Sequence, residues 1–419
     1  MDPRFFPACL AIAFGIALPA LAQSPAPASP LTLPQVLQAA RDNVDVSLAR
    51  RAVAGAAADV VAADRSPVPV LSAKTSSIDL ENGVGPGNTL RDKRIDKGVG
   101  LDWTLERGNK RTLRTQAAQR NEQAARLDLA EIQLQQQVLA ASAFFELVAA
   151  QERIEQVAAL ERSAADLAAA AQRRLRAGDL SQQDTLRTEI EARRAQADLR
   201  GAQAERQRAA LALAQLTGLR NELRAQATWP APGPVPAHAP DAEQRADVRA
   251  ARERVQAAQV ALDAANALRK NDVTLGASVD HYPGTSRRLL ELRLQMPLGG
   301  VAGAYGYDGE IARARVALEQ AQDQLEKVRR AAEADMGRLL EDLRTASARS
   351  ADFEDHIVPR ARQVAAMAEL AYSRGALTLT DLIEARRTLR AVLLDELAAR
   401  ADYARAHTAW QLRQAAVTP

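Results

Sequence analysis

The sequence has few aromatic residues and almost no cysteine. Aromatic residues make up 3% of its 419 residues, whereas charged residues make up 26%. Such a composition is poor material for a large compact core and suits long helices that pack through small side chains. The single cysteine, Cys9, lies well before the expected mature N-terminus. We therefore expect neither a disulfide nor a lipid anchor in the mature protein.

The sequence also lacks a long apolar run after its first 22 residues. A transmembrane helix needs about 20 apolar residues, so none is expected, and any membrane crossing would have to use strands. Residues 1–22 have the form of a secretory signal peptide, with Arg4, an apolar run from Ala8 to Leu18, and Ala20-Leu21-Ala22 as a cleavage site. The net charge of +3 is small for this length, and it does not point to nucleic acid as a partner.

Residues that could carry catalysis or hold a metal are few and scattered. The four histidines lie far apart, and none has acidic or histidine neighbours at a typical zinc-ligand spacing. His356, next to Glu354 and Asp355, comes nearest, and a solvated helix face explains it better than a metal site. We predict no enzyme activity, no cofactor and no metal site.

Two glycine-centred segments match each other at a distance of 197 positions. Residues 176–181 and 373–378 both place a glycine, then a leucine, then a hydroxyl residue between long alanine-rich and charged stretches. The glycines suit a left-handed helix end, and the hydroxyl residues suit the cap of the next helix. Each segment is therefore predicted to be the tip of a helical hairpin. The matched residues are Gly178, Leu180 and Ser181 in the first tip, and Gly375, Leu377 and Thr378 in the second.

The match extends to two structural repeats, residues 31–218 and 241–415, which are separated by a proline-rich linker at 219–240. Each repeat is predicted to run as a helix, a β-hairpin, a long helix, the tip and a return helix. The first helix is predicted to be continuous from Pro34 to Asp64, and the hairpins to span 68–105 and 272–298. Period-two alternation is clearest in Val99 to Leu105 and Val273 to Val279.

The four strands have one apolar and one polar face, which fits a barrel wall between lipid and water. Ordinary hairpins on a soluble domain are the alternative, but four strands among long helices have no other sheet to join. Four strands also cannot close a barrel in lipid, so several chains must share one. The long helices carry seams of small and apolar residues, and Arg111 to Ala171 has no strong breaker. About 60 residues would reach on the order of 90 Å, which favours a tube of helices, while Pro359 should interrupt the corresponding helix of the second repeat.

The order, spacing and duplication of these features resemble the TolC-type outer-membrane efflux family. The resemblance rests on the Leu31-Thr32-Leu33 opening, on a strand pair in each half, and on Tyr372-x-x-Gly375 followed by Thr378, Asp381 and Glu384. It implies a mainly α fold with a small β part. The long helices would form an α-barrel in the periplasm, and the four strands of each chain would join a trimeric barrel in the outer membrane.

The resemblance also implies functional sites. Asp381 and Glu384 would ring a narrow periplasmic aperture, and Asp184 and Tyr372 would belong to the network that holds it shut. Leu377 stands where the family can have a basic residue, so this latch must be built differently. An exposed leucine in each tip, Leu180 or Leu377, would contact a periplasmic adaptor protein. Exposed helix charges and simple turns are the alternative interpretations of these residues.

The expected function is that of an outer-membrane channel in a tripartite efflux system. The expected partners are two further copies of the chain, outer-membrane lipid, a periplasmic adaptor and an inner-membrane pump, such as one of the resistance-nodulation-division type that exports heavy metals or drugs. The main alternative is a soluble periplasmic coiled-coil adaptor or scaffold. An adaptor would be expected to carry a single hairpin between strand-rich modules, which the duplicated layout lacks.

Overall fold

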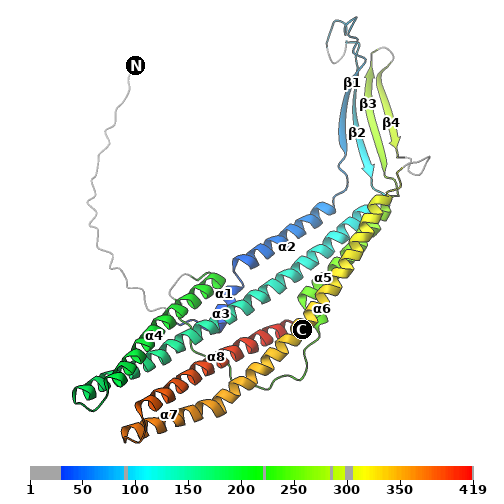
Figure 1. The fold of residues 1–419 in the computed structure, drawn as a ribbon. Coiled ribbons are helices and arrows are strands. Elements are labelled where there is room, and N and C mark those ends of the chain that lie inside the picture. Colours follow the sequence, from blue (N-terminus) through cyan, green and yellow to red (C-terminus); the bar gives the residue numbers. More distant parts are fainter. Residues whose placement is uncertain (1–29, 89–92, 220–222, 284–285, 298–304, 418–419) are drawn as a thin grey trace, which may run out of the picture.

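The computed structural model describes residues 30–88, 93–219, 223–283, 286–297 and 305–417 as an elongated, mainly helical molecule with a small sheet at one end (Figure 1). The predicted signal peptide at 1–22 lies outside these residues. The predicted mainly α fold with a small β part is confirmed. The α-helices are α1 Leu33–Ala40, α2 Val44–Ala63, α3 Lys110–Arg176, α4 Gln182–Thr217, α5 Ala246–Ala267, α6 Asp308–Asp352, α7 Val358–Ser373 and α8 Leu379–Val417. A 3-10 turn, η1 Ala242–Gln244, precedes α5, and a π-helical segment, η2 Phe353–Ile357, joins α6 to α7.

The helix α3 is the central member of the molecule. Its 67 residues span about 100 Å, and it packs on α2 and α5 in the half nearer the sheet and on α4 and α8 in the half farther from it (Figure 1). The helices α6 and α7 complete the second side by packing on α5 and α8. The result is a wall one helix thick. Across this wall, the neighbouring helices follow the order α2, α3, α5, α6 near the sheet and the order α4, α3, α8, α7 at the far end.

The sheet contains β1 Val70–Ser76, β2 Asp96–Leu105, β3 Val273–Tyr282 and β4 Ser286–Gln295, all antiparallel in sequence order. The first strand has 7 residues and begins at Val70, inside the hairpin predicted at 68–105. The two hairpins of the two repeats meet where β2 pairs with β3, with Gly98 opposite Asp280 and Asp102 opposite Gly276. The facing carboxylate occupies the space beside each glycine. A Cβ added to either glycine would collide with that carboxylate.

Each carboxylate on this polar face is reached across its glycine by a cation two strands away. Lys74 Nζ lies 3.1 Å from Asp280, and Arg293 Nη1 lies 3.7 Å from Asp102. The opposite face of the sheet is apolar and exposed. Its side chains are half or more exposed at several positions, namely Val99, Leu101, Val279, Leu290, Leu292 and Leu294. One face of the sheet therefore holds internally paired charges, and the other has no apolar partner within the described chain.

Two predictions about helix continuity need correction or refinement. The helix expected from Pro34 to Asp64 is two helices, because Asn43 begins a new one by accepting a hydrogen bond from the Val46 amide at 2.9 Å. An asparagine competes with helical bonding in this way, and apolar spacing does not reveal it.

The interruption expected at Pro359 takes the form of η2 in the turn before it. A wider π turn relieves the clash between the proline ring and the preceding carbonyls without breaking the helical path.

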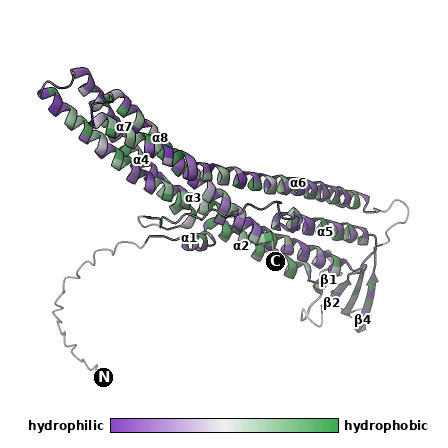
Figure 2. Cartoon of the chain, turned by 90° about the horizontal axis from the view of Figure 1, so that it is seen from below, coloured by the Kyte–Doolittle hydropathy of each residue, from purple (hydrophilic) through white to green (hydrophobic). Residues whose placement is uncertain are grey.

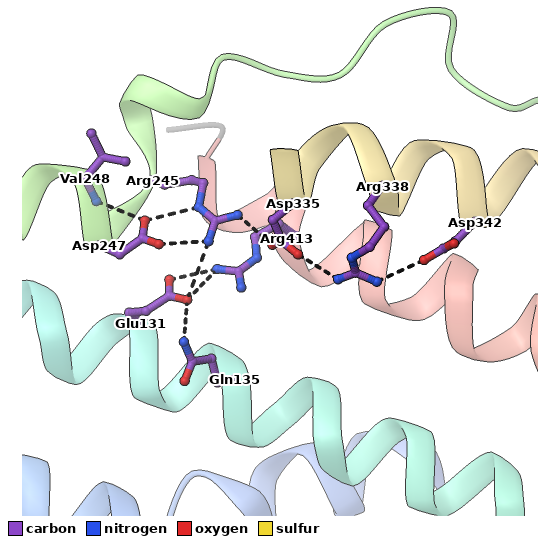
Figure 3. Close-up of polar contacts among 9 residues, drawn as sticks. All are labelled: Glu131, Gln135, Arg245, Asp247, Val248, Asp335, Arg338, Asp342 and Arg413. Carbon is purple, nitrogen blue, oxygen red and sulfur yellow. Dashed lines mark hydrogen bonds and ion pairs between the residues drawn. The ribbon is translucent and has the colours of Figure 1, made fainter. Parts of the chain in front are cut away.

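A buried charge cluster joins four helices at mid-height (Figure 3). At its centre Glu131 of α3 accepts hydrogen bonds at 2.7 and 2.8 Å from Arg413 of α8, and its Oε1 lies 4.0 Å from Arg245 at the start of α5. Arg245 also pairs with Asp335 of α6 at 2.8 Å. Glu131, Arg245 and Arg413 are each less than 9% exposed. The cluster fixes the end of α8 and the start of α5 to the two helices that run past them.

Two members of this cluster, Asp335 and Arg245, have pKa values shifted in favour of their charged forms. Burial disfavours the charged form of Asp335, but hydrogen bonds from Arg245 and Arg338 outweigh burial and lower the pKa of Asp335. Burial likewise disfavours the cation of Arg245, yet hydrogen bonds to Asp247 and Asp335 leave the pKa of Arg245 raised. A buried charge is costly to leave without its partner, so each member of the cluster holds the others in place.

Hydrophilic residues are spread along each long helix (Figure 2). Within the described ranges, none of the helices is long and apolar enough to cross a membrane.

Candidate functional site

The two hairpin tips lie together at the end of the molecule farthest from the sheet (Figure 1). The chain reverses at Gly178 and Gly375, which have φ values of 83° and 76°. These left-handed values suit glycine. In the next helix, Ser181 Oγ accepts a hydrogen bond from the Asp184 amide at 3.1 Å, and Thr378 Oγ1 accepts one from the Asp381 amide at 3.2 Å. Both tips are therefore built by the same local chemistry.

The two aspartates of the expected aperture take part in these caps. Asp184 accepts a hydrogen bond from the Ser181 hydroxyl at 2.8 Å, and Asp381 accepts one from the Thr378 hydroxyl at 2.6 Å. Arg187 lies 3.8 Å from Asp184. Asp381 is exposed and Asp184 is partly buried, and both lie on the first turn of a helix, where the helix dipole favours negative charge.

The hairpins are held to each other by arginine side chains. Arg174 Nη1 donates to Tyr372 Oη at 3.0 Å, and Arg187 Nη1 donates to Thr380 Oγ1 at 2.9 Å. The structure thus brings Tyr372 and the first hairpin together, but through Arg174 rather than through Asp184. Leu377 has no polar group to offer, and arginines on the first hairpin make the connections instead.

A further ion pair ties α8 to α4 between two and three turns from the start of each helix. Arg387 donates to both carboxylate oxygens of Glu191, with Nε 3.3 Å from Oε2. The bond from Arg387 lowers the pKa of Glu191 despite partial burial of the carboxyl, and it raises the pKa of Arg387. Arg387 also lies 3.7 Å from Glu384, so this residue of the expected aperture has a cation beside it.

Sequence reasoning missed Arg174, Arg187, Glu191 and Arg387. They belong to charged runs that are equally typical of a solvated helix face. Their roles depend on which faces of two distant hairpins meet, and neither the spacing nor the repeat specifies this.

The expectation that Leu180 and Leu377 are exposed is wrong. Both are half-buried and pack on the small apolar cluster of Ala368, Leu379, Leu382 and Ile383, which lies between the two tips. These cluster residues belong to α7 and α8, so Leu180 packs on the other hairpin and Leu377 packs on its own, and burial stabilises both leucines. The remaining predicted tip residues, Gly178, Ser181, Gly375 and Thr378, are exposed.

No group of three or more histidine, cysteine, aspartate or glutamate residues that could hold a metal ion occurs in the part of the chain that the structure describes. The arrangement at the tips offers hydrogen bonds and ion pairs between hairpins, together with exposed charge at their ends. Such a site can close an opening and bind a partner.

Comparison with known proteins identifies the family. Residues 33–219 match the model of a family described as outer membrane efflux protein. The first repeat of this chain therefore matches the outer-membrane efflux family. The cobalt-zinc-cadmium resistance protein CzcC of Cupriavidus metallidurans is 26% identical to this efflux protein over 378 residues, which cover 86% of this chain and 84% of CzcC.

Solved structures show the same fold. The outer membrane protein VceC of Vibrio cholerae aligns with a TM-score of 0.74 at 20% identity, over 92% of this chain and 95% of VceC. The open state of the MtrE outer membrane channel of Neisseria gonorrhoeae also gives a TM-score of 0.74, at 17% identity, over 92% of this chain and 88% of MtrE. The predicted family, fold and outer-membrane location of this efflux protein are confirmed, and its neighbours are channel proteins rather than enzymes. The same relatives favour an outer-membrane channel over a soluble adaptor.

Proposed function

We propose that this efflux protein is the outer-membrane exit duct of a tripartite export system. A pump in the inner membrane would deliver substrate through a periplasmic adaptor, and the duct would pass it out unchanged. The single observation that best supports this function is that the described chain is a wall, one layer thick, with two open edges. A wall of this form encloses no space alone, but copies of it can.

The open edges run along the helices. The outer side of α4 exposes Leu186 and Ile190, each 51% exposed, and the outer side of α7 exposes Met367 and Leu370, 55% and 51% exposed. Neither side has a neighbouring helix within the described residues. An apolar seam on each edge suits contact between the α4 side of one copy and the α7 side of the next, and repetition of this contact closes a ring.

The sheet has open edges at β1 and β4, and these strands run in opposite directions. The β4 edge of one copy can therefore pair antiparallel with the β1 edge of the next, which continues the pattern of the sheet. We propose a homotrimer, in agreement with the trimeric form of the family's channels. In this ring the exposed apolar face of the sheet would meet lipid, and the face with paired charges would line the water-filled interior.

The tips form the periplasmic aperture in this proposal. Asp381 and Glu384 would line the mouth, and Asp184 and Tyr372 would help to hold it closed. The contacts from Arg174 and Arg187 to the second hairpin, and the Arg387–Glu191 ion pair, support a closed arrangement within one chain. Opening would require the α7–α8 hairpin to move away from α3 and α4, which breaks these contacts. The exposed tip residues Gly178, Ser181, Gly375 and Thr378 would contact the adaptor.

The transported substrate is proposed only as a class. The name of the relative CzcC refers to resistance to cobalt, zinc and cadmium. Divalent ions of these metals are therefore the first substrates to test, by comparing growth of cells with and without this gene on each metal.

The decisive experiment for the duct is to extract the protein from membranes with detergent and to measure its oligomeric state and conductance in planar bilayers. We expect an oligomer that needs detergent, dissociates on heating and forms ion-conducting pores. A water-soluble monomer without conductance would overturn the proposal.

A further inference from the structure

The two hairpin tips have the same fold but opposite net charge. Residues 173–187 contain four arginines and two aspartates, whereas the residues of the second tip at the same repeat positions, 370–384, contain one arginine, one aspartate and one glutamate. Three of the four arginines, Arg173, Arg174 and Arg176, occupy the last turn of α3, and all three are exposed. The first tip is therefore basic and the second is weakly acidic.

Folding of the tip does not account for this difference. Basic side chains at the end of a helix are favoured by its dipole. However, α7 ends in the same kind of turn at Gly375, with the same φ sign and the same pattern of backbone bonds, and its last turn contains no basic residue. Arg374, the residue after its end, is the only cation of the second tip. The hairpin turn therefore does not need three arginines.

Contacts within the chain do not account for the difference in charge between the two tips either. Arg174 and Arg187 reach the second hairpin, as described above, and so serve the contact between hairpins. Arg173 and Arg176 make no side-chain hydrogen bond or ion pair with any residue in the described ranges. Two cations thus remain unneutralised at the extreme end of the molecule, with Asp179 as the only carboxylate between them and the start of α4.

We infer that the first tip is an electrostatic docking site for carboxylates on a helical hairpin of the periplasmic adaptor, and that the second tip is not. This inference rests on the proposed function. In a closed ring of identical chains, first and second tips alternate around the mouth, so basic and weakly acidic positions alternate too. A ring of identical adaptor hairpins would then meet two kinds of site, one strengthened by charge and one that depends on close contact with Ser373, Gly375 and Ala376 alone.

The test is photo-crosslinking in intact cells of the natural host, with a photoreactive amino acid placed at Ala177 of the first tip or at Ala376 of the second. Both alanines are exposed, so neither replacement disturbs the core. In the R173Q/R176Q variant we expect the yield of adaptor crosslinks at Ala177 to fall about three- to tenfold, and the yield at Ala376 to change less than about twofold. The matched R374Q variant should leave the Ala177 yield within about twofold of the wild type.

The crosslinked adaptor peptide, identified by mass spectrometry, should contain aspartate or glutamate at a turn between helices. The conservative R173K/R176K variant should retain most of the Ala177 yield, because it keeps both charges. A yield that is the same in R173Q/R176Q as in the wild type, or a crosslinked peptide without carboxylates, would overturn the inference. Bilayer conductance of the wild-type protein separates the two proposals. Its absence defeats the channel, whereas normal conductance with charge-insensitive crosslinks defeats only the basic docking site.

Discussion

Removal of the central carboxylate of the buried charge cluster should destabilise this efflux protein strongly. Glu131 is 6% exposed and is the only carboxylate bonded to Arg413 among the described residues. Glu131→Ala would leave the Arg413 guanidinium, which is 8% exposed, without an anion at the junction of α3 and α8. Arg245 would keep its ion pairs with Asp247 and Asp335. One uncompensated buried charge costs about 3–5 kcal/mol, which is the loss that we expect.

The matched control is Glu122→Ala on the same helix. Glu122 pairs with Arg126 one turn away, and Arg126 is 63% exposed, so water replaces the lost contact. This change should cost about 0.5 kcal/mol. The double variant E131L/R413M removes both charges and keeps most of the volume, so it should recover most of the stability that E131A loses.

The assay is guanidinium unfolding of the protein in detergent, followed by the loss of helical circular dichroism. The midpoint of E131A should fall several times further than that of E122A, and the midpoint of E131L/R413M should lie near the wild type. Equal shifts for E131A and E122A would refute the reasoning, because they would mean that Arg413 is solvated or paired elsewhere. A double variant no better than E131A would show that the loss came from packing rather than from charge.

Four further predictions concern the proposed aperture and the sheet. Arg387→Ala should raise bilayer conductance by releasing α8 from Glu191, with Arg330→Ala, an exposed arginine on α6, as the control. Because the pKa of Glu191 is lowered in the folded protein, the wild-type contact should persist as the pH falls from 7 through the ordinary titration range of a glutamate and be lost only at lower pH, so conductance that rises already at pH 6 would contradict this role. Replacing Asp381 and Glu384 with Ala should lower the preference for cations in the same bilayers, and unchanged selectivity would count against these residues as the lining of the mouth. Gly98→Ala should reduce the yield of heat-dissociable oligomer, because its Cβ would collide with Asp280, whereas Gly55→Ala, with open space around it, should not.

Much of the fold could be predicted because local sequence patterns specify it. The glycine and hydroxyl pairs at residues 178–181 and 375–378 specify helix end and helix start within a few positions. Alternation from Val99 to Leu105 specifies a strand with one apolar face. The break at Asn43 was missed because the apolar spacing continues through it, and only the side-chain bond to the Val46 amide ends the first helix there.

The site was less predictable because it depends on contacts between distant segments. Asp184 and Asp381 could be located from the repeat, but Arg174 meets Tyr372 across 198 positions, and no spacing rule links them. Leu180 and Leu377 were assigned to the surface because both follow an exposed turn. Whether they face solvent or the apolar cluster of α7 and α8 depends on how the helices near the tips pack, which only the folded structure shows.

The helices end at different points along the molecule, and this divides it into two parts that can move separately. α4 and α8 both stop at mid-height, while α3 continues unbroken and α6 reaches α7 through the wider turn of η2. A hinge at η2 and a pivot at the Glu131 cluster would let the α7–α8 arm swing while the strand end stays still. The force needed to part the arms would then be set near the tips, by a few arginine contacts, and it would not propagate as strain into the sheet.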